Sequence, residues 1–438
     1  MTMWMLALLS VEAHAKEWFV APDGTGNGAD GRPFGSIQDA LRMAEPGDTV
    51  VVRRGIYPES IRTIRSGSAG APIVIRGEGG PDAVVITKAG IVLQIAHSFV
   101  TIENLAIDAS YAQRTAVKVA AGVQSAVLRR VEIRRSGRDC VDIGAAIDVL
   151  IEDSSIHHCL NAATGRTDAH GVVAGAVKGL TLRGTEIHSF SGDAIQLNRT
   201  GTERSDGWTD VLIERCRFWL APLTSEENGF PAGAITGENA LDTKVASTSP
   251  RARIRIRDTQ AWGFGGGLIN VQAAFNLKEN IDAIIDGVTV SKSEVAFRIR
   301  GSVNGKTGAR VRMQNVVLYD VAVGVRYEDV VQDLRIWNTT FGRNVTRAFA
   351  DASSAGRTKP DVRNVAFLQA DLPVEAEEAS NLAVNEGAFV NAPGHDYRPA
   401  AGSRLIDAGV AIEDVQSDRA GIRRPQGQTS DVGAYEAR

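Results

Sequence analysis

A pair of apolar residues separated by five positions recurs along most of the chain, and this repeat limits the possible folds more than any other feature. The repeat reads IENLAI from Ile102, LRRVEI from Leu128, IEDSSI from Ile151, LRGTEI from Leu182 and IERCRF from Ile213, and it continues to VRNVAF from Val362. Successive copies begin 23 to 43 residues apart. A second series of short apolar segments lies between them, such as VDIG at Val141 and IQLN at Ile195. Two interleaved series with this period predict a solenoid of parallel strands.

The fold class that this period predicts is all-β, a single-stranded right-handed parallel β-helix of about ten rungs, each rung being one turn of the solenoid. The handedness follows the usual rule for parallel crossovers. Leucine-rich repeats have a similar period, but their spaced leucines are absent, and a β-propeller needs longer units with antiparallel blades. The segment FGSIQDALRMAEPGD has the pattern of a short helix with Ser36 as its N-cap. We expect this helix to cap the open first rung.

The chain divides into three predicted parts. Residues 1–15 combine a short apolar run with the small-x-small ending Ala13-His14-Ala15, which is typical of a signal peptide cleaved near Ala15. Residues 16–370 form the β-helix with its N-terminal cap, and residues 371–438 lose the period and wrap the last rungs as an irregular cap. The protein is therefore expected to be secreted or periplasmic, and no other apolar stretch approaches the ~20 residues that span a bilayer.

Charge and cysteine content restrict the possible functions. The chain has 48 basic and 52 acidic residues and a net charge of −4, so no global field draws it toward nucleic acid or anionic lipid. Its three cysteines, Cys140, Cys159 and Cys216, do not form a disulfide framework. Two alternatives remain for Cys140 and Cys159, a bridge between them or two buried free thiols.

The chain opens with WFVAPDGTGNGADGRPFGSIQDAL, continues with GDTVVVRRGIY and closes with SDVGAYE. These stretches resemble secreted bacterial right-handed β-helix proteins of the pectate-lyase-like superfamily. The resemblance implies the same fold over nearly the whole chain. It does not single out one activity, because the superfamily includes lyases, glycosidases, epimerases and surface proteins.

Outward side chains of the second series are expected to form two rows along one face, because side chains alternate along a strand and rungs lie ~4.8 Å apart. The acidic and amide end of these rows holds Asp142, Gln196, Asn198 and Asp242, and the basic end holds Lys244, Asn270, Gln272, Arg298, Arg300 and Arg326. The three arginines have no acidic partner in the rows before Glu328, which indicates that they meet an anion. The longest insertions, Arg199 to Asp210 and Trp219 to Gly237, arise beside this face, and their Trp208, Trp219 and Phe230 suit stacking against sugar rings.

Basic residues beside oxygen ligands suit an acidic polysaccharide, whose carboxylates repeat along the chain. β-Elimination of a uronate requires neutralisation of its carboxylate, a base for the C5 proton and help for the departing O4. We expect Lys244 to be the base and Arg298 or Arg300 to hold the carboxylate or assist the leaving oxygen. Calcium would neutralise the carboxylate, with Asp242, Glu238, Asp193 and Asn198 as its predicted ligands. The predicted substrate-binding residues are Gln196, Asn270, Gln272, Arg326, Lys278 and Trp219. This set looks like the lysine, arginine and calcium of β-helix lyases that act on alginate, pectate or dermatan-type chains.

A second constellation pairs His170 with Asp193, because both lie in the turn before a strand of the second series. They are expected to be neighbours and to act as an acid/base or metal pair, unless His170 is a turn residue bonded to backbone. The run Arg251 to Arg257 alternates as a strand with one charged, solvated face and is expected on another sheet.

Other functions remain open beside the lyase. A glycoside hydrolase would use a carboxylate pair from Asp142, Asp242 and Glu238. A C5-epimerase would share the first step of the lyase, and a non-catalytic polysaccharide-binding surface protein would keep the basic strip alone. The expected partner is an acidic polysaccharide, with no nucleic acid and no membrane span, and the chain is expected to be a monomer.

Overall fold

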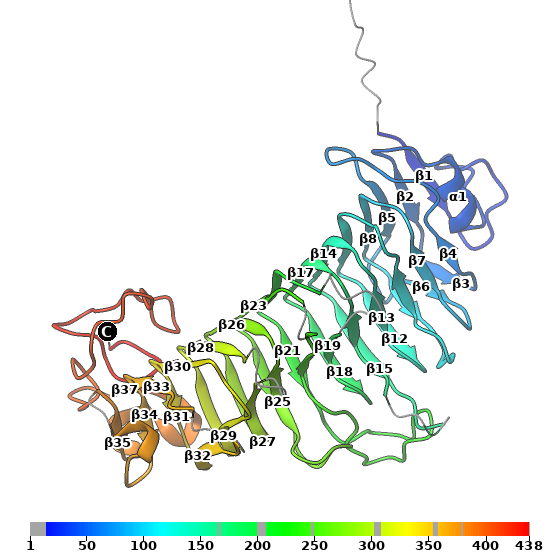
Figure 1. The fold of residues 1–438 in the computed structure, drawn as a ribbon. Coiled ribbons are helices and arrows are strands. Elements are labelled where there is room, and N and C mark those ends of the chain that lie inside the picture. The colour runs from blue at the N-terminus through cyan, green and yellow to red at the C-terminus, as the bar shows by residue number, and fades with distance from the viewer. Residues whose placement is uncertain are drawn as a thin grey trace, which may run out of the picture.

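The computed structural model of the protein describes residues 15–163, 165, 168–198, 207–246, 249–301, 308–353, 358–377 and 380–437. The predicted leader therefore lies outside the described residues except for Ala15. The described chain winds into an elongated solenoid of stacked parallel strands, with its N-terminal end at β1 and its C-terminal end beyond β35 (Figure 1). Among these residues, no helix is long and apolar enough to cross a membrane.

The first sheet contains 13 strands that follow one another rung by rung. They are β1 (Glu17–Val20), β2 (Thr49–Val52), β5 (Ile73–Gly77), β8 (Val100–Glu103), β11 (Ala126–Arg129), β14 (Ile147–Glu152), β17 (Lys178–Arg183), β20 (Val211–Glu214), β23 (Ala252–Arg257), β26 (Ile281–Asp286), β28 (Arg310–Gln314), β30 (Asp333–Trp337) and β33 (Asp361–Arg363). The first apolar series is in register from Ile102 through Leu128 and Ile151 to Val362, as the repeat predicts. The count exceeds the predicted ten because β1, β2 and β5 precede the first recognisable repeat.

A 22-stranded sheet forms the other two faces of the solenoid. One face, here called the polar face, contains β7 (Leu93–Ile95), β10 (Val117–Val119), β13 (Val141–Ile143), β16 (Val172–Ala174), β19 (Ile195–Leu197), β22 (Leu241–Thr243), β25 (Ala273–Lys278) and β32 (Val345–Asp351). The other contains β9 (Ala106–Asp108), β12 (Glu132–Ser136), β15 (Ser155–Cys159), β18 (Glu186–Phe190), β21 (Arg217–Trp219), β24 (Gln260–Trp262), β31 (Thr340–Phe341), β34 (Ala366–Leu368) and β35 (Leu382–Val384). The long strands β27 (Thr289–Arg300) and β29 (Val317–Glu328) run through both faces.

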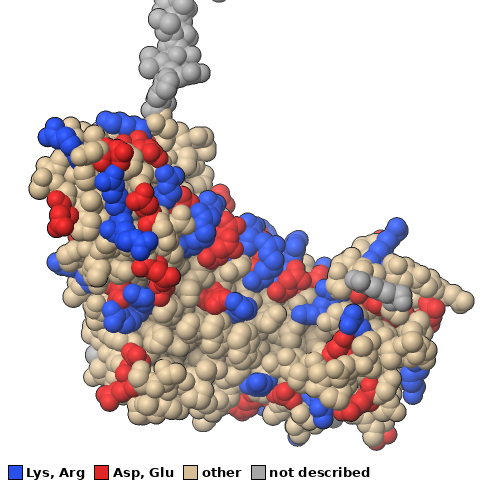
Figure 2. Space-filling model, turned by 180° about the vertical axis from the view of Figure 1, so that it is seen from behind, with Lys and Arg blue, Asp and Glu red and all other residues tan. Residues whose placement is uncertain are grey.

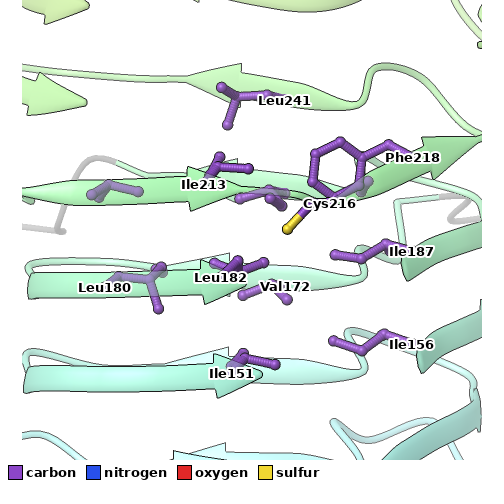
Figure 3. Packing of buried hydrophobic residues seen from close by; sticks show 14 of the residues in the cluster. Ile151, Ile156, Val172, Leu180, Leu182, Ile187, Ile213, Cys216, Phe218 and Leu241 are labelled. Atoms are coloured by element: carbon purple, nitrogen blue, oxygen red, sulfur yellow. The ribbon is translucent and has the colours of Figure 1, made fainter. Parts of the chain in front are cut away.

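The core fills the inside of the solenoid with stacks of apolar side chains from all three faces. Ile151, Leu182 and Ile213 lie above one another from the first sheet, opposite Ile156 and Ile187 (Figure 3). Phe275 and Phe297 stack with their ring centroids 5.2 Å apart. Because each rung contributes the same inward positions, the outward positions also align, and any chemistry on the surface is arranged in rows.

The two ends of the solenoid depart from the repeat. Helix α1 (Ile37–Met43) follows its N-cap Ser36, whose side chain accepts from the N–H of Asp39. The helix packs on β1, β2 and the short β4 (Ile61–Arg62). β4 pairs with β7, and β3 (Gly55–Tyr57) pairs with β6 (Val84–Thr87). At the other end β35 still pairs in parallel with β34, so the stacking extends past residue 370. The chain then forms the antiparallel pair β36 (Phe389–Asn391) and β37 (Asp396–Pro399), with short 3₁₀ turns at Val374–Ala376, Glu386–Ala388 and Ala392–Gly394.

The C-terminal tail turns back and binds the turns of earlier rungs. Asn315 donates to the carbonyl of Ser417 at 3.1 Å, and Asn338 donates to that of Asp431 at 3.2 Å. Cys140 and Cys159 form a disulfide, which settles the alternative left open by the sequence, and Cys216 is a buried free thiol.

Opposite charges alternate along the outer surface of the first sheet. Its end positions form a row, here called the charge ladder, of Arg76, Glu103, Arg129, Glu152, Arg183, Glu214, Arg257 and Asp286. Arg129 Nε lies 2.8 Å from Glu152, and Arg183 bonds Glu152 at 3.1 Å and Glu214 at 2.5 Å. Seen from behind, Lys and Arg side chains are intermixed with Asp and Glu over the molecule (Figure 2). The run Arg251 to Arg257 contains β23 of the first sheet, so it lies on a different sheet from the predicted rows of polar residues, as expected. Its arginines point outward.

Candidate functional site

One row of outward side chains runs along the polar face. The strand register sets its members as Gln94, Lys118, Asp142, Val173, Gln196, Asp242, Asn276, Arg298 and Arg326. The rung after Asp242 is therefore provided by β25 and not by Ile269–Gln272. The prediction that Asn270 and Gln272 stand in the rows is wrong, and Asn276 and Lys278 occupy those places.

The reason for this error lies in the insertion before β25. Ile269 and Val271 imitate the inward pattern of a strand, but Val271 has a φ of 57° and the segment is a series of bends. Asn270 is exposed outside the strand. Gln272 is fully buried and donates to the carbonyl of Glu238 at 2.6 Å, so it holds the loop and faces no substrate.

Two lysines converge on Asp242, and we call them the lysine pair. Lys278 Nζ lies 2.8 Å from one oxygen of Asp242 and 3.1 Å from the other, Oδ2, while Lys244 Nζ lies 3.5 Å from Oδ2. The two ammonium groups are therefore less than 7 Å apart. Burial and the charge of Asp193 raise the pKa of Asp242 to about 6, although Lys278 and Lys244 oppose this. The two lysines thus share one carboxylate, which leaves an excess of positive charge at this place.

The arginine cluster of Arg298, Arg300 and Arg326 follows the lysine pair along the face. All three guanidinium groups contact Glu328. Arg298 donates a hydrogen bond to it, Arg300 lies 3.6 Å from it and Arg326 lies 3.3 Å from it. Arg300 also lies 3.5 Å from Asp329. Glu328, the first acidic residue predicted in these rows, is therefore the shared partner of all three arginines, because long side chains from adjacent rungs reach it.

Two buried polar atoms at this place make no hydrogen bond to a described residue. They are Asn276 Oδ1, and Arg300 Nε, which lies 3.6 Å from Glu328 in an ion pair. Asn276 follows Asp242 in the row, and Arg300 follows Lys278 in the adjacent one. Unsatisfied buried groups are rare and require an explanation such as water or a ligand. The stretch from Asp242 to Arg300 therefore has hydrogen-bonding groups that await water or a ligand.

A second group of polar residues lies at the corner where the polar face begins. Asp139, His170, Asp193 and Asn239 each stand two residues before a strand of this face, and we call them the corner ladder. The backbone N–H of each of the last three donates to the side chain of the residue one rung earlier, at 3.2 Å to Asp139, 2.8 Å to His170 and 3.1 Å to Asp193. His170 and Asp193 are thus neighbours, as predicted, with 3.6 Å between Nδ1 and Oδ2.

His170 accepts from Asp193 N–H at Nδ1, and its Nε2 lies 2.8 Å from Asp168 and 3.1 Å from the amide of Gln196. Burial lowers the pKa of His170, but the bond to Asp168 and the charges of Asp193 and Asp139 outweigh it and raise the pKa to about 9. An Nδ1 that accepts a bond has no proton. The charged ring that the raised pKa favours therefore requires the bond from Asp193 N–H to break. A Cβ on Gly192 would meet Nδ1 at 2.5 Å, so only glycine permits this packing.

Glu238 stands beside the corner ladder and is only half buried. Its backbone N–H donates to Gly192, but its carboxylate makes no hydrogen bond or ion pair with a described residue. Burial, followed by the charges of Asp193 and Asp168, raises the pKa of Glu238 to about 7. A carboxylic acid that titrates near neutrality without a structural partner has the properties of a proton-transfer group.

Two of the four predicted calcium ligands are bonded to other side chains. Asp193 is fully buried and bonds Asn239 at 2.8 Å and Gln196 at 3.0 Å, while Asp242 is held by the lysine pair and by Asn276 at 2.9 Å. Glu238 precedes β22, whereas Asn198 follows the end of β19. Within the described part of the chain, no group of three or more His, Cys, Asp or Glu side chains is arranged to hold a metal ion. Calcium binding stays a prediction.

Two aromatic residues of the insertions are buried, and the third lies on a different face of the solenoid. Trp208 is 1% exposed and donates to the carbonyl of Lys244, and Phe230 packs with Leu160 and Leu223. Trp219 lies on β21 and not on the polar face, stacked between His188 at 4.3 Å and Trp262 at 5.0 Å. The predicted insertion from Arg199 lies outside the described residues as far as Asp206.

The loop between β21 and β22 borders the corner. It folds back over the earlier rungs, where the carbonyl of Asn228 accepts from Ala162 at 3.1 Å and Tyr111 bonds Glu227. It rejoins the solenoid at Glu238. This insertion therefore lies along the turns that precede the polar face, and its role in a binding groove stays a prediction.

Asp139 is a corner residue that the sequence analysis missed. Burial raises its pKa, and it accepts from the N–H of His170. The available signal was positional, because Asp139 precedes Val141 by the same two residues that separate His170 from Val172.

Comparisons with known proteins agree with this architecture. The sequence matches no protein-family model, and no curated protein matches it. Among solved structures, a rhamnogalacturonan lyase is 13% identical, with a TM-score of 0.55 and coverage of 86% of this chain and 91% of its own. The pectate lyase Pel9A is 15% identical, with a TM-score of 0.47 and coverage of 97% of each chain. A GH136 lacto-N-biosidase from Eubacterium ramulus is 13% identical, with a TM-score of 0.49 and coverage of 84% and 68%. The resemblance to pectate-lyase-like β-helix proteins is confirmed for the fold, which the rhamnogalacturonan lyase shares.

Proposed function

We propose that this protein is a polysaccharide lyase that cleaves a uronate-containing polysaccharide by β-elimination on its polar face. The observation that carries the proposal is the lysine pair. Two lysine side-chain nitrogens less than 7 Å apart, held by one buried carboxylate, match the two needs of a uronate at C5. One lysine, as an ammonium, neutralises the substrate carboxylate, and the other, as a free amine, stands beside the adjacent C5 proton.

The residues of the polar face supply each step. Lys278, whose side chain is 16% exposed, binds the uronate carboxylate, and Lys244, at 32%, is the more accessible and removes the C5 proton in its unprotonated form. The electrons of the C5–H bond form the C4–C5 double bond as the C4–O4 bond breaks. Arg300 lies in register with Lys278 and stabilises the charge that develops on O4. Asp242 positions both lysines.

The two atoms without a hydrogen bond support this placement. Asn276 Oδ1 accepts from a sugar hydroxyl, and Arg300 Nε, which lies 3.6 Å from Glu328, donates to a substrate oxygen, so a bound sugar provides hydrogen bonds that both atoms lack in the free protein. Glu238 and Gln196 lie on the preceding rungs and contact the next sugar units. The rhamnogalacturonan lyase likeness adds only that the fold is compatible with such a function.

Glu238 favours a second candidate, a glycoside hydrolase. A carboxyl group with a pKa of about 7 is suited to protonate a glycosidic oxygen, with Asp168, which is partly exposed, as the second carboxylate. This candidate explains Glu238 better and the lysine pair less well. It also requires no uronate in the substrate.

The test is incubation of the protein with pectate, alginate, rhamnogalacturonan and dermatan-type chains, with and without a calcium chelator. The lyase releases products that absorb ultraviolet light through the new double bond. We expect Lys244→Ala and Lys278→Ala each to lower the rate by at least a factor of about 100, with no effect of the chelator. The matched control is Lys118→Ala, since Lys118 stands on the same face, in the row of Asp242, and lies 3.9 Å from Asp142.

The other outcomes are distinct. New reducing ends without ultraviolet absorbance, lost in Glu238→Gln, identify the hydrolase. Equal loss in Lys118→Ala and Lys244→Ala contradicts the assigned site. Absence of both signals on all four polymers contradicts both enzyme candidates for these substrates and leaves the polar face as a binding surface.

A further inference from the structure

A cleft of about 560 Å³ separates the first sheet from the C-terminal tail, away from the polar face. Its walls are the ends of β23, β26 and β28 on one side and residues 417–421 of the tail on the other. Four guanidinium groups line it, from Arg255, Arg257, Arg312 and Arg419. The tail residue Arg419 is itself anchored by the carbonyl of Asn315 at 3.3 Å, which fixes this wall to the solenoid.

The cleft has guanidinium donors without acceptors. Arg255 makes no hydrogen bond or ion pair with a described residue, and Arg257 stands 3.7 Å from Glu214 at the end of the charge ladder. Arg312 is bonded to Asp414 through Nη1 at 2.8 Å, but its Nε is buried without a partner. Arg255 and Arg312 occupy the same outward row, separated by Ile284. The cleft therefore offers several donors to an anion.

The cleft also contains acceptors. Gln314 is 7% exposed, and its amide nitrogen donates to Asp286 while its Oε1 is buried without a hydrogen-bond partner, so this atom requires a donor. Asp258 is exposed, and its carboxylate makes no hydrogen bond to the described residues, so it is available to a ligand. By contrast, Asp418 accepts three backbone N–H groups of the tail and is satisfied. A plain inorganic anion leaves Gln314 Oε1 unpaired.

We infer that this cleft binds an acidic sugar unit, a carboxylate that also carries hydroxyl groups. The carboxylate takes the donors of Arg255 and Arg312, and the hydroxyls donate to Gln314 Oε1 and Asp258. The volume exceeds one pyranose ring, so the ligand is the end or a short stretch of a uronate-containing chain. The cleft lies on the first sheet, so it is a second carbohydrate site and does not rest on the activity proposed for the polar face.

The test is calorimetric titration with digalacturonate in the Lys244→Ala/Lys278→Ala background, which removes the lysine pair of the polar face. We expect binding to persist and Arg255→Ala to weaken it by a factor of about 10 to 100, the range for a lost charged hydrogen bond. Arg253→Ala is the matched control, because Arg253 lies on the same strand, is more than half exposed, pairs with Asp210 and does not line the cleft. Affinity that is unchanged in Arg255→Ala, or lost equally in Arg253→Ala, overturns the inference.

Gln314 separates a sugar site from a simple anion site. In the same background, Gln314→Met is expected to weaken digalacturonate by a factor of about 5 to 10 and to leave sulfate binding unchanged, because only hydroxyls use Oε1. Sulfate that binds as tightly as digalacturonate to the unsubstituted cleft contradicts the sugar assignment. The melting temperature of each variant is measured alongside, and Arg255→Ala, on an exposed side chain, tests the site even where Gln314→Met unfolds. Lyase activity is assayed separately, so failure here leaves the proposed function untouched.

Discussion

The charge ladder and the polar face are built by the same stacking but distribute charge in opposite ways. Along the ladder, Glu152 has an arginine on the rung before and the rung after it, and so does Glu214. On the polar face two lysines share Asp242, and three arginines share Glu328. At the corner, Asp139, Asp168 and Asp193 surround His170. In-register rungs ~4.8 Å apart make like charges costly, so their accumulation in one region points to function there.

The pKa directions follow this difference. The hydrogen bond from Arg129 lowers the pKa of Glu152 in the ladder. Burial raises the pKa of Glu238 to about 7 and that of Asp242 to about 6. A carboxyl group is therefore stabilised in its ionised form on the first sheet, at Glu152, and destabilised in that form at Glu238 and Asp242. Perturbed carboxyl groups of the second kind are typical of functional sites.

The largest expected effect is on activity. Asp242→Asn keeps the side-chain size but removes the charge that holds the lysine pair, so we expect the rate on the substrate polymer to fall by a factor of about 100 or more. Glu152→Gln removes a charge of the ladder and is expected to leave the rate unchanged. Initial rates of ultraviolet absorbance measure both. Equal losses in the two variants would remove the functional distinction between the regions.

A charge reversal is expected to make the ladder resemble the corner. Arg183→Glu places three acidic residues on successive rungs, at 152, 183 and 214, so two ion pairs are lost and two repulsions are gained. At roughly 0.5 kcal/mol for each of these changes, the free energy of unfolding falls by about 2 kcal/mol in low salt. Urea unfolding at two salt concentrations checks this, because sodium chloride screens the repulsion and recovers part of the loss. Arg183→Gln, which adds no repulsion, is the control and is expected to lose about half as much. A loss that is independent of salt would mean that packing, and not charge, sets the cost.

The sequence predicted the fold well because the fold is a repeat of local pattern. Every copy of the first series, from Ile102 to Val362, pairs in register with the next. The prediction of the second series was wrong once, at Ile269. There the apolar residues Ile269 and Val271 of an insertion fitted the strand pattern, whereas the strand contains Phe275 and Leu277. Periodicity alone does not distinguish these, since the core stacking of Phe275 on Phe297 decides the register.

The candidate site was only partly predictable for a related reason. The sequence placed Asp242, Lys244 and Arg298 on one face, and the neighbours His170 and Asp193 at one corner, because these follow from strand position. It did not predict that Glu328 reaches three arginines or that Lys278 bonds Asp242, because long side chains cross between rungs. The unpartnered state of Glu238 depends on a loop whose path leaves no periodic signal.

The smallest expected effect is a rise in the free energy of unfolding when the carboxylate of Glu238 is removed. Glu238 has a folded-state pKa of about 7, raised from 4.5, so between these values the folded state binds more protons than the unfolded state. Stability therefore falls as the pH rises from 4.5 to 7 and is constant above. Glu238→Gln removes this penalty and is expected to raise the free energy of unfolding by about 1 kcal/mol at pH 8, a value reduced for its partial exposure, and by nothing at pH 4. Urea unfolding at both pH values gives the comparison. Destabilisation of the same size at pH 4 and pH 8 would show that Glu238 is a structural residue like those of the charge ladder. A gain confined to high pH would show that the protein keeps a carboxylate here at a cost to its own stability, as expected of a group that contacts substrate.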